Sequence, residues 1–324
     1  MRRVEKQRGA ALLIVLLLAA TLSFIALASM EKTSLSAARA VNVNARSEAL
    51  WRAFATETLA RKAIKMAFAT SEGKMSIDDP WVSEPLNIPL DDGAAQIFFI
   101  DAGLCFNVNS LASDDGNEVS PSVEEFVRLA GHLGLSEFEA IALGEAIADW
   151  IDGDRNRRPQ GAEDEYYTTL PSPYRTGNRP MAAASEIRAV KGVNREIYAL
   201  LKPYLCAGEA GAPSVLNVNM LTEFHAPLLA ALLGENATMQ AATDIIAARP
   251  VGGYNDKTIF ISESLVQAAN PSENLESRIS VTSRRFHARA EIVYDTAILQ
   301  MTSDIAVNDS GETRVITRRI GAEE

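Results

Sequence analysis

The stretch from Lys6 to Met30 reads KQRGAALLIVLLLAATLSFIALASM and decides the fold of this 324-residue chain. Its last 21 residues, from Ala10 on, carry no charge, and a helix of that length covers about 30 Å, the thickness of the hydrocarbon core of a bilayer. Four basic residues and one acidic residue precede this run. The positive-inside rule therefore predicts a single-pass inner-membrane protein, with a cytoplasmic N-terminus and a periplasmic body after Met30.

The sequence allows three interpretations of how this segment is processed. A signal peptidase would cut near Ala28, within a small-x-small pattern, and a plain membrane anchor would remain uncut. A prepilin peptidase would instead cut between Gly9 and Ala10 and release a short basic leader. This third alternative accounts for a further feature, since no glycine or proline occurs between Gly9 and Gly73. An unbroken helix of over 60 residues would be on the order of 90 Å long, with a lipid-soluble front half.

The rear half of this helix is amphipathic. Apolar residues recur there at three- and four-residue spacing, at Trp51, Ala55, Leu59, Ala63 and Met66. Such spacing places them on one face of a helix. We expect this face to pack on a sheet of the same chain.

Two regions rich in β-forming residues flank a long helical region. Residues 96–109 and the alternating tail 278–319 indicate strands of one antiparallel sheet, and the residues between them read as helical. The simplest architecture is an α+β fold in which a large α-helical domain is inserted between strands of one antiparallel sheet. The expected division is a leader (1–9), a transmembrane part of the helix (10–30), its continuation with the first strands (31–109), the helical insert (110–275) and the C-terminal strands (276–324).

Charge and cysteine content agree with an acidic body in an oxidising compartment. The net charge is −11, and loss of residues 1–9, with their net charge of +3, changes it to −14. An acidic body argues against nucleic-acid binding through phosphates. The two cysteines, Cys105 and Cys206, both follow the membrane run. We expect a disulfide between them, with two buried free thiols as the alternative.

Acidic residues are concentrated between Asp149 and Glu165, where 17 residues supply six carboxylates. The residues at positions 1, 3, 5 and 12 of the calcium-loop pattern are Asp152, Asp154, Asn156 and Glu163. Position 6 is arginine where an EF-hand needs glycine, so we expect an oxygen-ligated calcium loop with its own geometry. The candidate ligands are Asp149, Asp152, Asp154, Asn156, Glu163, Asp164 and Asn178.

Other interpretations of the acidic stretch are weaker. It could be a solvated loop neutralised by Arg155, Arg157 and Arg158. Paired carboxylates also occur in glycosidases, but no serine elbow, clustered histidines or sugar-stacking aromatic residues accompany them, so we expect no enzyme activity. The three histidines are far apart in sequence, which disfavours a zinc site.

Several motifs in a fixed order resemble the minor pseudopilin K family of type II secretion systems. Besides the prepilin-like leader they are FNVNSL at 106–111, DWIDGD at 149–154, GAED at 161–164, YRTGN at 174–178, EIRAVKG at 186–192 and LNVNML at 216–221. The resemblance covers essentially the whole chain. It implies a pilin-like fold, in which a long N-terminal helix packs on an antiparallel sheet, with a large all-α insert of the SAM-like or helix-hairpin-helix-like kind. It also implies calcium near the acidic loop, processing and N-terminal methylation, and a tip complex with the minor pseudopilins I and J.

One residue within the membrane run refines this expectation. Pilins usually carry glutamate at the fifth mature position, where it meets the N-terminal amine of the subunit above, but here that position is Ile14. An unpaired carboxylate in lipid is costly, so a subunit with nothing above it is better without one. The absence of glutamate indicates a position at the tip of the fibre.

The second Asn-Val-Asn motif and the segments after it also resemble the helix-hairpin-helix modules of membrane-anchored DNA receptors. A hairpin that grips DNA needs a Gly-x-Gly turn and basic flanks. The corresponding turn here is LGEN at 233–236, which places a carboxylate where the phosphate would lie. We therefore expect the asparagines to bond backbone groups at strand-to-helix joints and expect no nucleic-acid partner. A membrane-anchored periplasmic DNA-binding protein is the alternative function.

Overall fold

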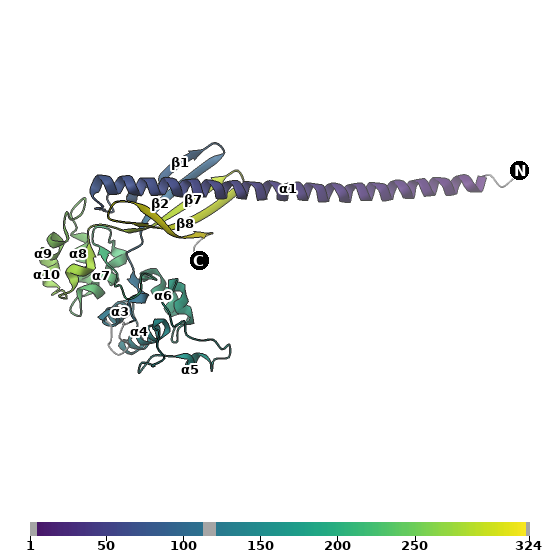
Figure 1. The fold of residues 1–324 in the computed structure, drawn as a ribbon. Coiled ribbons are helices and arrows are strands. Elements are labelled where there is room, and N and C mark those ends of the chain that lie inside the picture. Colours follow the sequence, from purple (N-terminus) through teal and green to yellow (C-terminus); the bar gives the residue numbers. More distant parts are fainter. Residues whose placement is uncertain (1–4, 113–120, 322–324) are drawn as a thin grey trace.

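A single helix dominates the molecule. The computed structural model describes residues 5–112 and 121–321, with the backbone alone for residues 5–9. The expected leader, residues 1–9, is therefore not described in full. Helix α1 (Glu5–Ser71) is unbroken over 67 residues, about 100 Å. Its front half stands clear of the body and its rear half lies along a sheet (Figure 1).

The front half of α1 is exposed on every side. All side chains from residue 10 to residue 44 are open to solvent. Within the described residues α1 is the one helix long and apolar enough to cross a membrane, and its most apolar 18-residue window has a mean hydropathy of 2.8. A helix with apolar residues on all faces and no protein around it is what a lipid-embedded segment requires.

Helix α1 ends two residues before Gly73, which is the first glycine after Gly9. Glu72 and Gly73 have φ values of 53° and 79°, and the Gly73 amide donates to the Phe68 carbonyl over 3.1 Å. A Cβ on Gly73 would lie 2.5 Å from Cε2 of Phe68. The left-handed conformation and this close approach together favour glycine at the helix end.

The sheet has five antiparallel strands in the order β1-β2-β7-β8-β9. Its central pair joins strands from opposite ends of the body, with Ile97 of β2 opposite Ala290 of β7. The α+β fold and the non-local sheet are as the sequence predicts. The strands are β1 (Leu86–Leu90), β2 (Gly93–Asp101), β7 (Arg285–Tyr294), β8 (Ala297–Val307) and β9 (Thr313–Ile320).

The face of α1 that packs on the sheet is not the expected one. Its buried residues are mostly small, at positions Ala45, Ala49, Ala53, Ala60 and Ile64. Of the apolar series from Trp51 to Met66, only Ala63 packs toward the sheet. Trp51, Ala55, Leu59 and Met66 are exposed, with Trp51 at 69 % and Met66 at 71 %. The prediction that this series packs on the sheet is therefore wrong except at Ala63, because small side chains let helix and sheet approach closely whereas tryptophan and methionine do not fit between them.

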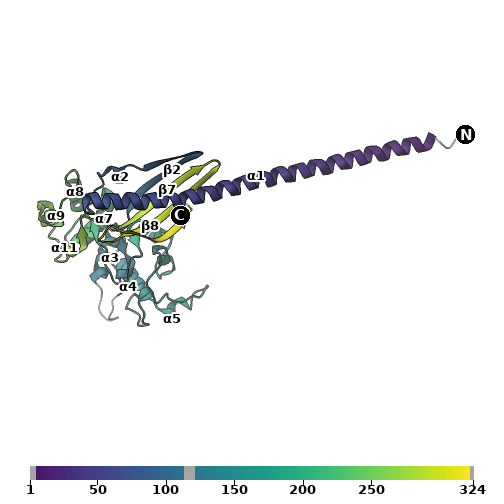
Figure 2. The ribbon, with the colours of Figure 1, turned by 45° about the horizontal axis from the view of Figure 1, so that its top comes forward.

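The chain between β2 and β7 forms the helical insert, at the end of the molecule opposite the N-terminus in both views (Figures 1 and 2). Within this region, residues 185–201 do not form one helix, because Gly192, with φ 87°, separates a 3-10 turn from the helix that follows. The α-helices after α1 are α2 (Pro80–Ser83), which precedes the sheet, and α3 (Pro121–His132), α4 (Glu137–Ile151), α5 (Asp164–Tyr167), α6 (Arg195–Leu201), α7 (Ala226–Leu233), α8 (Met239–Ala247), α9 (Lys257–Ser262), α10 (Ser264–Ala268) and α11 (Leu275–Arg278). The 3-10 turns are η1 (Val108–Ser110), η2 (Ala184–Ala189), η3 (Lys202–Tyr204) and η4 (Glu223–His225).

The insert consists of two lobes that close in the same way. In lobe 1, β3 (Phe106–Asn107) pairs in parallel with β4 (Leu205–Cys206). In lobe 2, β5 (Leu216–Asn217) pairs in parallel with β6 (Ile279–Ser280). Each pairing joins the entry of a lobe to its exit, so each lobe has a narrow neck.

The Asn-Val-Asn motifs belong to these necks. The Asn109 side chain donates to the Met181 carbonyl over 3.0 Å and accepts from the Met181 amide over 2.8 Å. Asn219 makes the same two bonds to Tyr254, over 3.0 and 2.7 Å. In both motifs the asparagine two positions earlier accepts from the amide of the second. The expected bonding of these asparagines to backbone is present, and it satisfies buried polar groups in both lobes.

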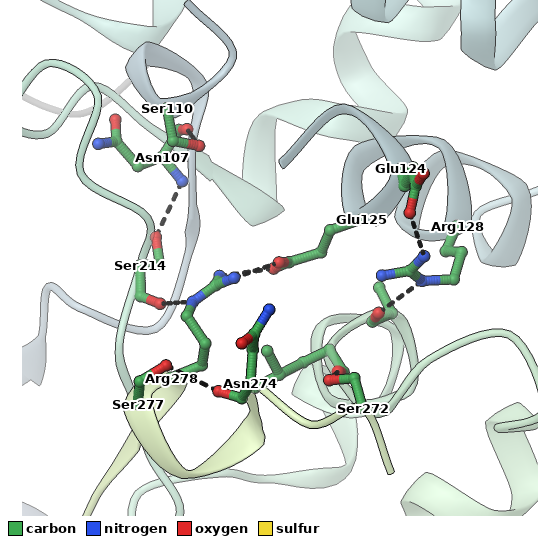
Figure 3. A network of polar contacts seen from close by, with 12 residues as sticks. Asn107, Ser110, Glu124, Glu125, Arg128, Ser214, Ser272, Asn274, Ser277 and Arg278 are labelled. Carbon is green, nitrogen blue, oxygen red and sulfur yellow. Dashed lines mark hydrogen bonds and ion pairs between the residues drawn. The ribbon is translucent and has the colours of Figure 1, made fainter. Parts of the chain in front are cut away.

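A buried ion pair joins the two lobes (Figure 3). Arg278 of α11 donates to both carboxylate oxygens of Glu125 of α3, over 2.6 and 2.9 Å, and to the Ser214 carbonyl between the lobes. Arg128 of α3 donates to the Ala231 carbonyl of α7 over 2.9 Å. Bidentate pairing of this kind fixes the orientation of both partners, so the lobes form one body.

Candidate functional site

The acidic loop begins at the C-terminal end of α4. Ser136 and Glu139 form a capping box that starts this helix, and Asp152 is its C-cap residue. Asp149 on the last turn is fully buried, and Asp152 is 6 % exposed. Burying carboxylates at the negative end of a helix dipole is unfavourable unless cations accompany them.

Three carboxylates of the loop come together. Ligand oxygens of Asp152, Asp154 and Glu163 lie within 4.8 Å of one another. Within residues 5–112 and 121–321, Oδ1 of Asp152, both carboxylate oxygens of Glu163 and Oδ1 of Asn178 are buried with no hydrogen-bond partner. Unpaired buried oxygens of this kind are costly in a protein interior. Their number and chemistry fit a hard, oxygen-ligated cation.

The electrostatics of Glu163 agree with this arrangement. Burial, and then the negative charges of Asp149 and Asp152, raise the pKa of the Glu163 carboxyl to about 7. A carboxyl in these surroundings resists ionisation unless positive charge lies beside it. A bound cation would supply that charge.

The other predicted ligands have different surroundings. Asp149 accepts hydrogen bonds from Arg158. Asp164 accepts from the amide and hydroxyl of Thr176, each over 3.0 Å. Asn156 is exposed. The backbone amide of Asn178 donates to the Trp150 carbonyl over 3.0 Å, and Trp150 lies two residues before Asp152 in the sequence. The structure thus brings together Asp152, Asp154 and Glu163, with a buried amide oxygen at Asn178.

Two interactions of the loop could not be predicted from the composition of the acidic stretch. Arg158 bridges Asp149 and Asp152 through one nitrogen, Nη1, over 2.7 and 2.5 Å, whereas Arg155 and Arg157 are exposed. Lys191, within the EIRAVKG motif, donates from Nζ to the carbonyls of Gln160 and Gly161 over 3.1 and 3.0 Å. The sequence identifies Arg158 as one of three arginines that could neutralise the loop. Which of the three does so depends on how the loop turns.

Cys105 and Cys206 form a disulfide with a Cα–Cα distance of 5.7 Å. The two residues are 101 positions apart in sequence, and Cys206 is the second residue of β4, opposite Asn107. The bond therefore closes the neck of lobe 1 beside the β3–β4 pairing.

The outer face of α1 forms a second candidate site, for a protein partner. We call Trp51, Ala55, Leu59 and Met66 the outer stripe. The three large side chains are 69 %, 40 % and 71 % exposed, and Ala55 is also exposed. A row of large apolar side chains open to solvent along several helical turns is typical of a protein interface.

Comparisons with known proteins agree with this architecture. The family model described as type II secretion system protein K matches residues 104–210 and 216–282, which correspond to the two lobes. The chain is 33 % identical to type II secretion system protein K of Pectobacterium carotovorum subsp. carotovorum over 293 residues, which cover 89 % of each chain. This chain belongs to the type II secretion system protein K family.

Further relatives extend the match over nearly the whole chain. Protein K of Klebsiella pneumoniae is 31 % identical, with 98 % of this chain and 97 % of the relative covered. A crystal structure of the GspK-GspI-GspJ complex from enterotoxigenic Escherichia coli contains a similar chain, with a TM-score of 0.78 and 27 % identity, covering 88 % of this chain and all of that one. As a member of this family, the chain is a minor pseudopilin and a structural component of protein secretion.

Proposed function

We propose that this protein K caps the tip of the type II secretion pseudopilus and helps to start its assembly, together with the minor pseudopilins I and J and without catalysis of its own. The observation that carries the proposal is the outer stripe of α1. The helix already covers its own sheet with its alanine face, so the stripe remains free for the helices of neighbouring subunits. The relative solved in complex with GspI and GspJ supports the identity of these partners.

A stripe variant tests this interface. Replacing both Trp51 and Met66 by glutamate should abolish co-purification with pseudopilins I and J, because charged side chains would have to be buried. Both positions are exposed, so thermal stability should change little. The matched control is Phe138→Glu, which replaces an equally exposed apolar residue (68 %) on the insert. Normal assembly by the double variant, or equal loss by the control, would reject the stripe as the docking surface.

The position at the tip is supported by the shape of the molecule and by Ile14. The insert lies at the end away from the membrane segment (Figure 1) and is too bulky to be repeated along a thin fibre. Ile14 lies within the apolar run, where pilins that continue upward carry glutamate. Ile14→Glu should therefore reduce assembly initiation and secretion. Unchanged secretion by that variant would remove the physical basis of the tip assignment.

The membrane segment agrees with a prepilin that is cut between Gly9 and Ala10, methylated at Ala10 and retained in the inner membrane with its body in the periplasm. Mass spectrometry of the mature N-terminus decides this. An N-terminal Ala10 carrying a methyl group is the expected result. A mature chain beginning near Ser29 would mean that the segment is a removed signal peptide.

The acidic loop is proposed to bind calcium through Asp152, Asp154, Glu163 and Asn178. The ion would supply positive charge to the buried oxygens and hold the loop closed within lobe 1. At about 100 times the dissociation constant it should add about 2.7 kcal/mol to folding, which is a rise of about 5–10 °C in melting temperature. If neither millimolar calcium nor a chelator changes the melting temperature, the site is excluded.

A further inference from the structure

The acidic loop is divided into two halves by a single side chain. In the first half, Asp149 has both oxygens occupied by Arg158. Nη1 of Arg158 donates to Oδ1 over 2.7 Å, and its backbone amide donates to Oδ2 over 3.1 Å. The chain also folds closely over this carboxylate, since a Cβ on Gly161 would lie 2.0 Å from Oδ2 of Asp149. This half is therefore already filled.

The second half contains oxygens without partners. They belong to Asp152 and Glu163, whose ligand oxygens lie within 4.8 Å of each other, and they have no hydrogen bond within the described parts of the chain. Oδ1 of Asn178, whose backbone amide bonds to the Trp150 carbonyl, is also without a partner there. Asp152 belongs to both halves, because its Oδ2 meets Arg158 over 2.5 Å and its Oδ1 is one of the unpartnered atoms. One carboxylate thus connects the arginine to the open half.

The charges around Asp152 distinguish the two halves further. The loop contains four neighbouring carboxylates and one guanidinium, whose side chain is 14 % exposed. Asp149 and Asp152 contact the guanidinium, and Asp154 and Glu163 lie beside Asp152. Three negative charges remain, and one divalent ion would leave a single negative charge, which is tolerable at a partly hydrated site. Without the guanidinium, one divalent ion would leave two uncompensated charges.

We propose that Arg158 is a permanent internal cation that fills the second cation position of the acidic loop, so that the loop takes one divalent ion instead of two. The inference rests on the cation site proposed above and goes beyond it by assigning the number of ions to a residue. Asp152 is then the bridge between the fixed cation and the exchangeable one, and Asp149 serves the fixed one.

Calcium counting on the full-length protein in detergent tests this. Equilibrium dialysis at millimolar calcium should give one ion per chain for the native protein. Arg158→Gln should bind a second ion, because Asp149 and Asp152 are then left without a cation. Arg158→Lys keeps the positive charge and should bind one ion with an affinity within about threefold of the native value. The matched control is Arg157→Gln, which removes the same charge from an exposed position of the same loop and should still bind one ion.

The possible outcomes separate the two proposals. If the native chain binds one ion and Arg158→Gln also binds one, Arg158 only orients Asp152 and the inference is overturned, while the cation site stands. A lysine variant that binds two ions, or none, also overturns it, and this holds even if Arg158→Gln does not fold. If the native chain binds no calcium, the cation site itself is wrong and the inference falls with it.

Discussion

Asp101 shows how a single residue connects the sheet to the insert. It is the last residue of β2, 6 % exposed, and accepts hydrogen bonds from the Gly103 amide over 2.8 Å and from the Ser283 hydroxyl. Ser283 also accepts from Asn217 of lobe 2. The carboxyl therefore lies where the chain leaves the sheet, and its partner lies where the chain returns.

Burial raises the pKa of the Asp101 carboxyl from 3.8 to about 6, although both hydrogen bonds act against the rise. Because the folded-state pKa lies above the unfolded value, ionisation of Asp101 costs stability. The penalty is absent below pH 4, develops as the pH rises through 6, and reaches about 3 kcal/mol. We expect Asp101→Asn to gain stability relative to the native chain by this amount between pH 4 and pH 7, as measured by chemical denaturation.

The control for this prediction is Asp91→Asn, at an exposed turn position, whose difference from the native chain should not vary in this way. A difference between native and Asp101→Asn protein that is constant from pH 4 to pH 7 would show that the carboxyl is not desolvated in solution.

The acidic loop could be predicted from residue spacing only in part. The calcium-loop pattern correctly groups Asp152, Asp154 and Glu163, because a turning loop brings alternate residues to one side. It also includes Asn156, which is exposed. The density of acidic residues adds Asp149 and Asp164 as candidates and cannot separate them from the cluster. Those two are withdrawn by Arg158 and Thr176, and such pairings arise from the path of the folded chain.

Among the elements, α1 shows which part of a helix a sequence determines. Its length follows from the absence of glycine and proline before Gly73, and this prediction is confirmed. Its packing face does not follow from hydrophobicity alone, because the buried side consists mainly of alanines with Ile64, whereas Trp51, Leu59 and Met66 lie outside. Periodicity identifies two faces of a helix, but which of them meets the sheet depends on how closely the two can approach.

Two alanines, one on each face of α1, test this assignment. Ala53 is fully buried against the sheet, and Ala55 is exposed. Ala53→Leu should destabilise the protein by about 1–3 kcal/mol through overpacking, whereas Ala55→Leu should change stability by less than about 0.5 kcal/mol. Both substitutions keep a good helix former, so the difference in denaturation midpoint reports packing alone. Equal effects at the two positions would contradict the observed orientation of the helix.

At the scale of the whole molecule, the two lobes of the insert are attached to the pilin-like body to different extents. Arg278 and Glu125 join the lobes to each other. The hydrophobic residues of lobe 1 belong to a cluster within the insert, whereas Met220 of lobe 2 belongs to a cluster between α1 and the sheet. A family match divided at residues 210 and 216 reflects this construction. We therefore expect lobe 1 to lose order without unfolding the sheet.

The disulfide provides the decisive test of that independence. Replacing Cys105 and Cys206 by serine opens a loop of about 100 residues, for which the chain-entropy model gives about 4.7 kcal/mol and experience with native disulfides about 2–5 kcal/mol. We expect faster amide hydrogen exchange in α3, α4 and α6 of lobe 1, with α1 and the strands β7 and β8 unchanged. A reductant should produce the same pattern in the native protein and no further change in the serine variant. Equal acceleration in lobe 1 and the sheet would instead show that the molecule unfolds as one cooperative unit.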